Sequence, residues 1–371
     1  MNILVAGDFC PKERIATVLE QEDYASLLGD VKGIITQADY SIVNFECPVT
    51  KGDEKPIPKL GPNLRSSEKG IKAIKWAGFD CVTLANNHFY DFGDEGVAHT
   101  LDACNRYRID TVGGGRDLEE AIKILYKQIG SQTLAIINCC EHEFSIATDK
   151  TGGSNPLNPI QQYYSIKEAK SKADNVLVIV HGGHEHWQLP SPRMVETYRF
   201  FIDAGADAVV NHHQHCYSGY EVYHGKPIFY GLGNFCFDIN PPRNNMIWNY
   251  GYMVKLFFGK EGIDFEIVPY NQCGEQLRVR LLPKDTFDEK LKELNTIIAD
   301  QKKLYEATDG YYESCAEQCS NIFEPIRNRI YLAFKHRRWL PSMISEKRKL
   351  HAENYICCEA HRDKVIWFLK H

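Results

Sequence analysis

The sequence predicts an α/β fold followed by a mainly helical C-terminal extension. Short apolar segments alternate with stretches of helical spacing through the first 240 residues, and this alternation favours a sheet covered by helices. After about Pro283 the spacing becomes mainly helical. We therefore divide the chain into a domain of residues 1–283 and a helical extension of residues 284–371.

The predicted elements follow in chain order. Residues 2–6 form an apolar run that ends at Gly7 and Asp8, which is typical of a buried first strand. Segments 226–230 and 252–258 follow one another without a helix, so we expect a mixed rather than a purely parallel sheet. The elements predicted between these ends are strands at 41–45, 81–85, 134–138, 175–180 and 208–210, and helices at 70–77 and 191–204.

The extension combines a helical stripe with a basic segment. Apolar residues spaced by four, three and four form one face of a helix, at Phe287, Leu291, Leu294 and Ile298. The basic segment, residues 327–349, holds eight Lys and Arg and one acid, with apolar residues such as Trp339 among them. A solvated helical face is the simpler interpretation; the alternative is a docking patch for an anionic membrane or polymer.

The composition is that of an ordinary globular protein. The 371 residues include 43 Lys+Arg and 49 Asp+Glu, a formal charge of −6, and with this slightly acidic balance we expect no nucleic-acid partner. A hydrophobic fraction of 43% excludes a wholly disordered chain. The first residues lack the basic start and long apolar run of a signal peptide. We expect a cytoplasmic protein, with the inner membrane face as a peripheral location if the basic segment docks there.

Cysteine and histidine are both unusually frequent. The 13 Cys are an odd number in a chain without an export signal, which argues against a disulfide framework and favours small buried side chains. Of the 14 His, seven fall between His181 and His224. This clustering indicates a functional site.

Residues able to bind metal follow five of the predicted strands. The carboxyl ends of strands in open α/β sheets meet along one rim, so these residues are expected to lie close together. Imidazole with carboxylate and amide oxygens suits Mn, Fe, Zn or Mg in a hydrolytic centre. The five places are Asp8; Asn44 with Glu46; Asn86-Asn87-His88 with Asp91; His181; and Asn211-His212-His213-Gln214-His215.

Each of the five places is weak evidence alone, and three of them also have an ordinary structural interpretation, whereas the run His212-His213-Gln214-His215 is harder to explain by structure alone. Gly7-Asp8 and Asn86-Asn87 are common turn sequences, and His181 after an apolar strand is a possible core histidine. His213 and His215 are two residues apart after a strand, and strand alternation would place both rings on one side. The occurrence of all five in order favours a metal site.

The motifs at these places resemble those of the capsule-synthesis (CapA-type, poly-γ-glutamate biosynthesis) family of calcineurin-like metallophosphoesterases. The resemblance covers about residues 1–240. The matching segments include Gly7-Asp8, Asn44-Phe45-Glu46, residues 84–93 (LANNHFYDFG), residues 180–185 (VHGGHE), residues 211–215 (NHHQH) and residues 225–235 (GKPIFYGLGNF).

The resemblance implies a two-sheet sandwich flanked by helices, with one or two divalent ions on one rim. It also implies that His88 is a general acid or phosphate contact and that Asp91 orients it. The implied metal ligands are Asp8, Glu46, Asn87, His181, His213 and His215. The implied substrate contacts are Asn44, Glu185 and Asn234.

Two positions depart from the superfamily pattern. Cys10 stands where a histidine is usual, so either it is a soft ligand or the first metal position is weaker or vacant. Glu46 is one methylene longer than the usual bridging aspartate. Both departures leave a one-metal variant open.

The resemblance implies a metal-dependent phosphoester hydrolase in or beside capsule, exopolysaccharide or poly-γ-glutamate assembly. A metal-bound hydroxide would attack phosphorus in a phosphorylated or polymeric anionic substrate. One alternative is a metal-dependent amidohydrolase or transferase acting on a γ-glutamyl polymer or glycan carrier. Another is a non-enzymatic, metal-stabilised scaffold whose basic segment recruits a capsule-assembly complex or a membrane surface.

Overall fold

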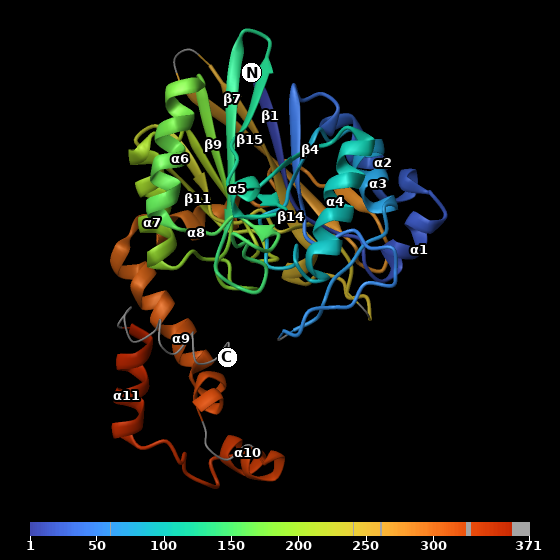
Figure 1. Ribbon diagram of the computed structural model, residues 1–371. Helices are drawn as coiled ribbons and strands as arrows, with labels where there is room; N and C mark the ends of the chain where they lie inside the picture. Colours follow the sequence, from blue (N-terminus) through green and yellow to red (C-terminus); the bar gives the residue numbers. More distant parts are fainter. Residues whose placement is uncertain (60, 240, 260–261, 324–327, 358–371) are drawn as a thin grey trace. The chain divides into compact units, whose positions relative to one another are not determined.

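Strands and helices alternate along the first part of the chain, as predicted, and the strands build two sheets (Figure 1). The computed structural model describes residues 1–59, 61–239, 241–259, 262–323 and 328–357. The prediction of a mixed α/β fold is confirmed. Of the predicted strands, those at 134–138 and 175–180 are each longer in the structure, because their flanking residues also pair in the sheet.

The first sheet has eight strands in the order β16-β15-β14-β1-β2-β3-β4, with β13 also paired to β1. It is mixed, since β1 runs parallel to β2 and β13 and antiparallel to β14. Its strands are β1 (Asn2–Cys10), β2 (Tyr40–Phe45), β3 (Cys81–Thr83), β4 (Asp110–Val112), β13 (Asn234–Phe237), β14 (Tyr250–Phe258), β15 (Ile263–Gln272) and β16 (Val279–Leu281).

The second sheet has six strands in the order β11-β12-β10-β9-β7-β6, parallel at its centre and antiparallel at both edges. Its central strand β9 is buried along its whole length, which explains its continuous apolar sequence. The strands are β6 (Leu125–Ile129), β7 (Gln132–Cys140), β9 (Asn175–His181), β10 (Ala208–His212), β11 (Tyr220–Tyr223) and β12 (Lys226–Phe229). A separate pair joins β5 (Gly114–Gly115) and β8 (Gly153–Ser154).

Helices cover the outer faces of both sheets, giving the sandwich that was expected (Figure 1). Helices α6 and α7 pack on the second sheet, and α2 and α4 pack on the first. Both α6 and α7 begin with a side-chain cap followed by proline, from Asn158 and Ser191. The helices are α1 (Arg14–Glu20), α2 (Tyr24–Ile35), α3 (Lys69–Ala77), α4 (Gly93–Tyr107), α5 (Leu118–Ala121), α6 (Pro159–Lys172), α7 (Pro192–Ala204), the 3₁₀ turn η1 (Ile247–Asn249) and α8 (Asp288–Ala299).

The two sheets are joined by a buried hydrogen bond. His212, at the end of β10, contacts the carbonyl of Ala6 in β1 through Nε2 at 2.9 Å. Both residues are almost completely buried. His212 therefore has a structural position between the sheets, although it belongs to the histidine cluster of the sequence.

The first compact unit extends to Leu304, so it includes α8. The division at residue 283 had assigned this helix to the extension. In the structure the stripe of Leu291 and Leu294 is buried, and Asn295 accepts a hydrogen bond of 2.7 Å from the backbone N–H of Tyr220 in β11. The stripe was identified correctly, but it packs on the sheet domain.

The second unit comprises residues 305–371, and its described part is mainly helical, with a non-helical stretch at 337–345. Its helices are α9 (Gln301–Phe323), which begins in the first unit, α10 (Arg329–His336) and α11 (Glu346–Cys357). Arg327 of the basic segment lies outside the described residues. No helix in the described ranges combines the length and apolar character that crossing a bilayer requires.

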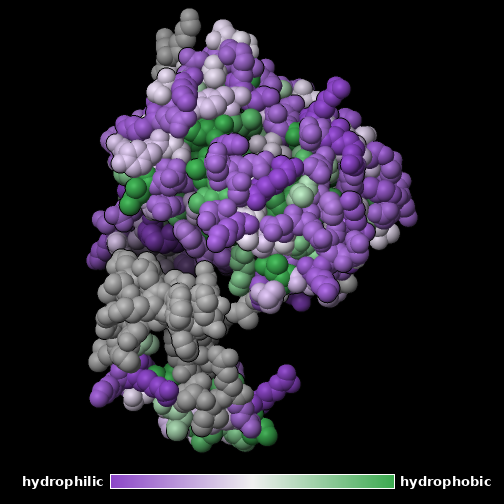
Figure 2. Space-filling view, viewed as in Figure 1, coloured by the Kyte–Doolittle hydropathy of each residue, from purple (hydrophilic) through white to green (hydrophobic). Residues whose placement is uncertain are grey.

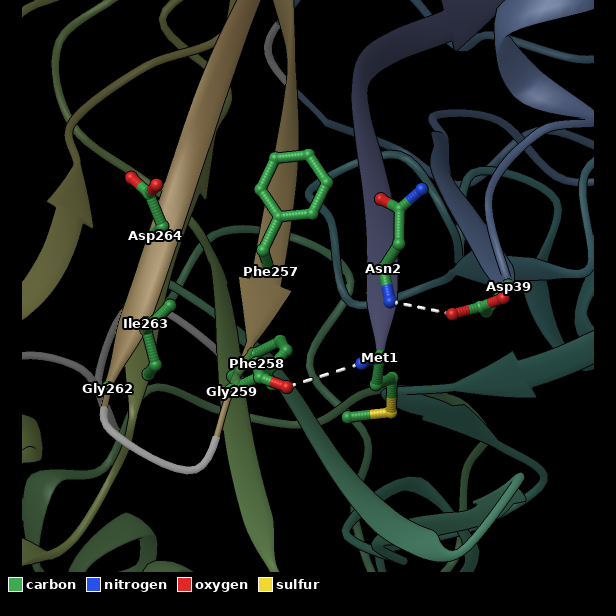
Figure 3. A pocket seen from close by; sticks show the side chains of 9 residues that line it. All are labelled: Met1, Asn2, Asp39, Phe257, Phe258, Gly259, Gly262, Ile263 and Asp264. Atoms are coloured by element: carbon green, nitrogen blue, oxygen red, sulfur yellow. Dashed lines mark hydrogen bonds between the residues drawn. The ribbon is translucent and has the colours of Figure 1, made fainter.

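The face of the molecule seen in Figure 2 is mostly hydrophilic, with smaller hydrophobic areas between. An open hollow of about 710 Å³ lies at the amino end of β1 (Figure 3). Two of its polar groups are hydrogen-bonded within the chain: the Asn2 backbone N–H donates to Asp39, and the Met1 amino group donates to the Phe258 carbonyl. This hollow lies at the opposite end of β1 from Asp8 and contains neither of the ligand groups described below.

Candidate metal centre

The register of three neighbouring strands places the first residues of the site side by side. In the first sheet, Asp8 of β1 is paired with Asn44 of β2 on one side and with Asn234 of β13 on the other. In the second sheet, His181 at the end of β9 is paired with His212 at the end of β10. The carboxyl ends of β1, β2, β9 and β10 therefore bring these predicted residues to one rim. Asn234 reaches the same rim from the first residue of β13, although the sequence had placed it at the end of a strand.

Glu46, just after β2, lies at the centre of this rim. Its side chain is fully buried, and neither carboxylate oxygen has a hydrogen-bond partner among the described residues. Its Oε1 lies 3.7 Å from Nε2 of His181 and 3.6 Å from Nε2 of His215. A buried carboxylate without partners is costly, and a bound cation is one arrangement that would offset this cost.

Two groups of possible ligands share Glu46. The ligand atoms within each group lie within 4.8 Å of one another. Because Glu46 belongs to both groups, its carboxylate could contribute a ligand to either. The first group is Asp8, Glu46 and His215, and the second is Glu46, His181 and His213.

Asn87 extends the second group. Its side-chain oxygen lies 3.0 Å from Nε2 of His181, and the same Nε2 lies 3.1 Å from Nδ1 of His213. An amide oxygen and two imidazole nitrogens thus converge on a small volume. A divalent cation suits such a set of lone pairs, so the residues fit the implied metal.

Burial controls the charge of these groups. It raises the pKa of Asp8 to about 7, although hydrogen bonds from Asn44 and from the His213 N–H oppose the rise. It also raises the pKa of Glu46 well above its ordinary value, with a further contribution from Asp8. Burial and the neighbouring histidines lower the pKa of His181 and His215 well below the ordinary value. The imidazoles are therefore neutral and able to bind metal.

Asn44 and Asn234, expected as substrate contacts, are in hydrogen-bonding contact with the candidate ligands. Asn44 Nδ2 donates to Asp8 Oδ1 at 2.7 Å and lies 3.3 Å from His181 Nδ1. Asn234 Oδ1 accepts from His215 Nδ1 at 2.9 Å, which leaves Nε2 as the unprotonated nitrogen that faces Glu46. Both asparagines are fully buried, and both orient ligand side chains as outer-shell partners commonly do.

His88 and Asp91 form a pair at the edge of the cluster. His88 Nδ1 lies 2.7 Å from Asp91 Oδ2, and Asp91 is fully buried. Burial lowers the pKa of His88, while Asp91 acts in the opposite direction. Lys59 also contacts both residues, and the sequence analysis missed it because it lies in an irregular segment without a periodic signal.

Two further asparagines, Asn86 and Asn138, hold the loop after β3 in place, a role that the sequence did not predict. Asn86 receives the backbone N–H of His88 and donates to the Phe45 carbonyl. Asn138 in β7 accepts from the backbone N–H of Ala85 at 2.8 Å. They fix the loop that carries Asn87 and His88, and only a buried polar residue within an apolar strand signals Asn138.

Glu185 and Cys10 are not brought into either group. Glu185 is exposed, and its described ion-pair contact is with the adjacent His186. Cys10 is fully buried, and it contributes to raising the pKa of the Cys47 thiol, which burial already raises well above its ordinary value. The soft-ligand alternative for Cys10 therefore finds no geometric support among the described residues.

The strand-alternation argument for His213 and His215 was wrong. Strand β10 ends at His212, so both residues lie in the following loop. Their backbones have φ of 90° and 53°, a region that residues other than glycine rarely adopt. Backbone strain of this kind is concentrated at functional sites. The loop conformation, rather than strand alternation, directs both rings to Glu46.

Comparison with known proteins identifies similar sequences. A family model described as "Bacterial capsule synthesis protein PGA_cap" matches residues 2–239. Capsule biosynthesis protein CapA of Bacillus anthracis is 32% identical over 246 residues, which cover 64% of this chain and 60% of that protein. PGA biosynthesis protein CapA of Bacillus subtilis (strain 168) is 34% identical over 235 residues, covering 62% of each. The chain thus spans about three fifths of the length of these curated relatives.

Among solved structures, 5'-nucleotidase from Candida albicans SC5314 aligns with a TM-score of 0.43 and 11% identity. The alignment covers 85% of this chain and 57% of that one.

Proposed function

The chain belongs to the bacterial capsule synthesis family, and from this premise we propose that it is a metal-dependent phosphoester hydrolase. We place its activity in or beside capsule or poly-γ-glutamate assembly, on a phosphorylated or polymeric anionic substrate. Family membership supports the setting, and the chemistry of the rim supports the reaction.

One observation carries the proposal: the Glu46 carboxylate is buried, neither of its oxygens has a hydrogen-bond partner among the described residues, and the residue belongs to both ligand groups. A purely structural carboxylate at this position would be satisfied by donors. Asp8 and His215 would hold a divalent ion on one side of Glu46, and His181 and His213 on the other. When bound, such ions supply Lewis acidity, polarising a phosphoryl oxygen and acidifying water at neutral pH.

The remaining chemistry belongs to the residues of the chain. Because Asp91 accepts the Nδ1 proton of His88, Nε2 is the ring nitrogen available for proton transfer to a leaving oxygen. To donate from Nε2, the ring must first take up a proton there from water, and the Asp91 carboxylate stabilises that protonated ring; the ring is neutral again once the leaving oxygen has taken the proton. Asn44 and Asn234 keep the ligands oriented through the reaction.

The test is hydrolysis of a panel of phosphomonoesters and phosphodiesters by the purified protein with Mn²⁺. Replacing His88 by glutamine should lower kcat by about 10² to 10⁴-fold while leaving bound Mn²⁺ unchanged. The matched control is His224→Gln, because His224 is exposed and lies outside both ligand groups. Absence of turnover in the native protein, or equal turnover in both variants, would contradict the proposal. Cleavage of a γ-glutamyl amide in place of a phosphoester would assign amidohydrolase chemistry.

A second proposal concerns the basic segment, for which we infer an anionic membrane surface as partner. Its described part exposes the large apolar side chains of Ile330, Trp339 and Met343 beside the cationic residues. The Arg337 guanidinium lies 5.7 Å above the Trp339 ring, so charge and aromatic surface are adjacent. Basic residues flanking interfacial aromatics are typical of peripheral membrane binding.

Vesicles with and without phosphatidylserine test this partner on the full chain. Each basic residue near an anionic surface contributes about 1 kcal/mol, so Arg337→Glu with Arg338→Glu should weaken binding at least about tenfold. The control is Lys167→Glu with Lys172→Glu on α6, which also reverses two exposed charges. Equal binding to neutral vesicles, or equal loss in both double variants, would exclude the partner.

A further inference from the structure

A short anchor segment, residues 57–59 and 61–64, closes around Asp91. The backbone N–H of Ile57 donates to the Asp91 carbonyl at 2.9 Å, and the Asn63 amide donates to the same carbonyl at 3.1 Å. The backbone N–H of Leu64 donates to Asp91 Oδ2 at 2.6 Å. Asp91 is therefore the point at which this irregular segment is attached to the site.

The anchor segment also places a cation beside the proposed catalytic pair. The Lys59 ammonium is ion-paired with Asp91 Oδ1, and the exposed fractions of the two side chains are 2% and 0%. It lies 3.1 Å from His88 Nδ1 and 5.6 Å from the centre of the Phe144 ring. Burying an ammonium is costly unless it is paired, so Lys59 is held in place by Asp91.

Three groups contact the two oxygens of the Asp91 carboxylate: the Lys59 ammonium, the Leu64 backbone N–H and His88 Nδ1. Lys59 occupies Oδ1, whereas Leu64 N–H and His88 Nδ1 meet Oδ2. The Lys59 ammonium can only donate a hydrogen bond, and the Asp91 carboxylate can only accept one. His88 Nδ1 therefore bonds to Lys59 when it lacks a proton or to Asp91 when it carries one, but not to both. The Asp91 contact is shorter, 2.7 Å against 3.1 Å, and it requires Nδ1 to carry the proton.

We propose that Lys59 is a positioning residue that acts on His88 through Asp91. By occupying Oδ1 and offsetting the Asp91 charge, it keeps Oδ2 directed at His88 Nδ1 and holds the anchor segment beside the ring. Lys59 belongs to neither ligand group, and its described contacts are with Asp91, His88 and Phe144, so we assign it no part in metal binding. The effect of Lys59 on kcat rests on the proposed function, whereas its effect on the Leu64 hydrogen bond and on the His88 ring does not.

The experiment compares Lys59→Met, Lys59→Arg and the control Lys55→Met, which removes an exposed lysine from the same region. Hydrogen exchange reports on the Leu64 amide, and a long-range ¹H–¹⁵N spectrum reports on the His88 ring nitrogens. Lys59→Met should accelerate Leu64 exchange at least tenfold and shift the His88 Nδ1 signal. Lys59→Arg should retain both wild-type readouts, and Lys55→Met should change neither.

Unchanged Leu64 exchange and an unchanged His88 signal in Lys59→Met would overturn the inference. If Lys59→Met does not fold, the Lys59→Arg variant tests the inference. Loss of the His88 Nδ1 signal in Lys59→Arg, which retains the positive charge, would also overturn the inference. With an active enzyme, Lys59→Met should lower kcat at least tenfold with little change in KM and in bound Mn²⁺. If the native protein shows no turnover, the proposed function fails, while the exchange and ring-nitrogen readouts still test Lys59.

Discussion

Replacing Glu46 by methionine should change stability in opposite directions with and without metal. The Glu46 carboxyl is fully buried, and its two oxygens have no hydrogen-bond partner in the part of the chain that the structure describes. A buried polar group without partners costs about 1–3 kcal/mol, and methionine fills a similar volume without that cost. At about 2 °C per kcal/mol for a domain of this size, the variant in EDTA should melt about 2–6 °C higher than the wild type.

Mn²⁺ should reverse this order. At a free concentration 100 times its Kd, the ion stabilises the wild type by about 2.7 kcal/mol. Methionine removes an oxygen ligand from both groups, and a variant whose affinity falls about 100-fold would gain only about 0.4 kcal/mol under the same conditions. Differential scanning calorimetry in EDTA and in Mn²⁺ measures both effects. A variant that is less stable in EDTA, or that gains as much from Mn²⁺ as the wild type, would refute the reasoning.

Three further predictions address the support of the site and of the fold. Asn234→Ala should weaken Mn²⁺ binding about 10 to 100-fold in titration calorimetry, because His215 loses its orienting acceptor. Gly7→Ala should unfold the rim or abolish expression, since the added Cβ would lie 1.8 Å from the Gly233 carbonyl oxygen; circular dichroism tests it. Burial raises the pKa of the Glu54 carboxyl, but hydrogen bonds from backbone N–H groups outweigh it and lower this pKa to about 2. A lowered pKa in the folded state stabilises the fold above the unfolded pKa, so this contribution of Glu54 is lost as pH falls from about 4.5 towards 2. Glu54→Gln should therefore cost about 2 kcal/mol in urea unfolding at pH 7 and much less near pH 2.

The sequence was informative wherever a local pattern determines position. Alternating apolar segments predicted the strands, and polar residues at their carboxyl ends predicted the rim, because parallel strands carry their ends to one edge. Asp8, Glu46 and His181 meet for this reason. The helical stripe from Phe287 was also visible, but its packing partner was not, since periodicity shows that a face is buried without showing against what.

The sequence was uninformative where tertiary contacts alone determine position. Lys59 lies in an irregular segment between β2 and α3, and nothing in its neighbours distinguishes it from the exposed Lys55. Its place beside Asp91 follows from hydrogen bonds across the fold. His213 and His215 were found for the wrong reason, because a positive φ at each cannot be derived from strand alternation.

The charge of the rim bears on how many ions it holds. Lys59 offsets Asp91, burial lowers the pKa of His181 and His215 so that both are neutral, and an imidazole that binds metal adds no charge, so Asp8 and Glu46 supply two negative charges when metal displaces their protons. One divalent ion balances these charges, whereas two would leave an excess of two positive charges in a buried site, which is costly without a counter-charge. We therefore expect the second ion and an anionic ligand to bind together. Bound Mn²⁺ per chain should be near one in phosphate-free buffer and rise towards two with inorganic phosphate, and a stoichiometry indifferent to phosphate would contradict this charge argument.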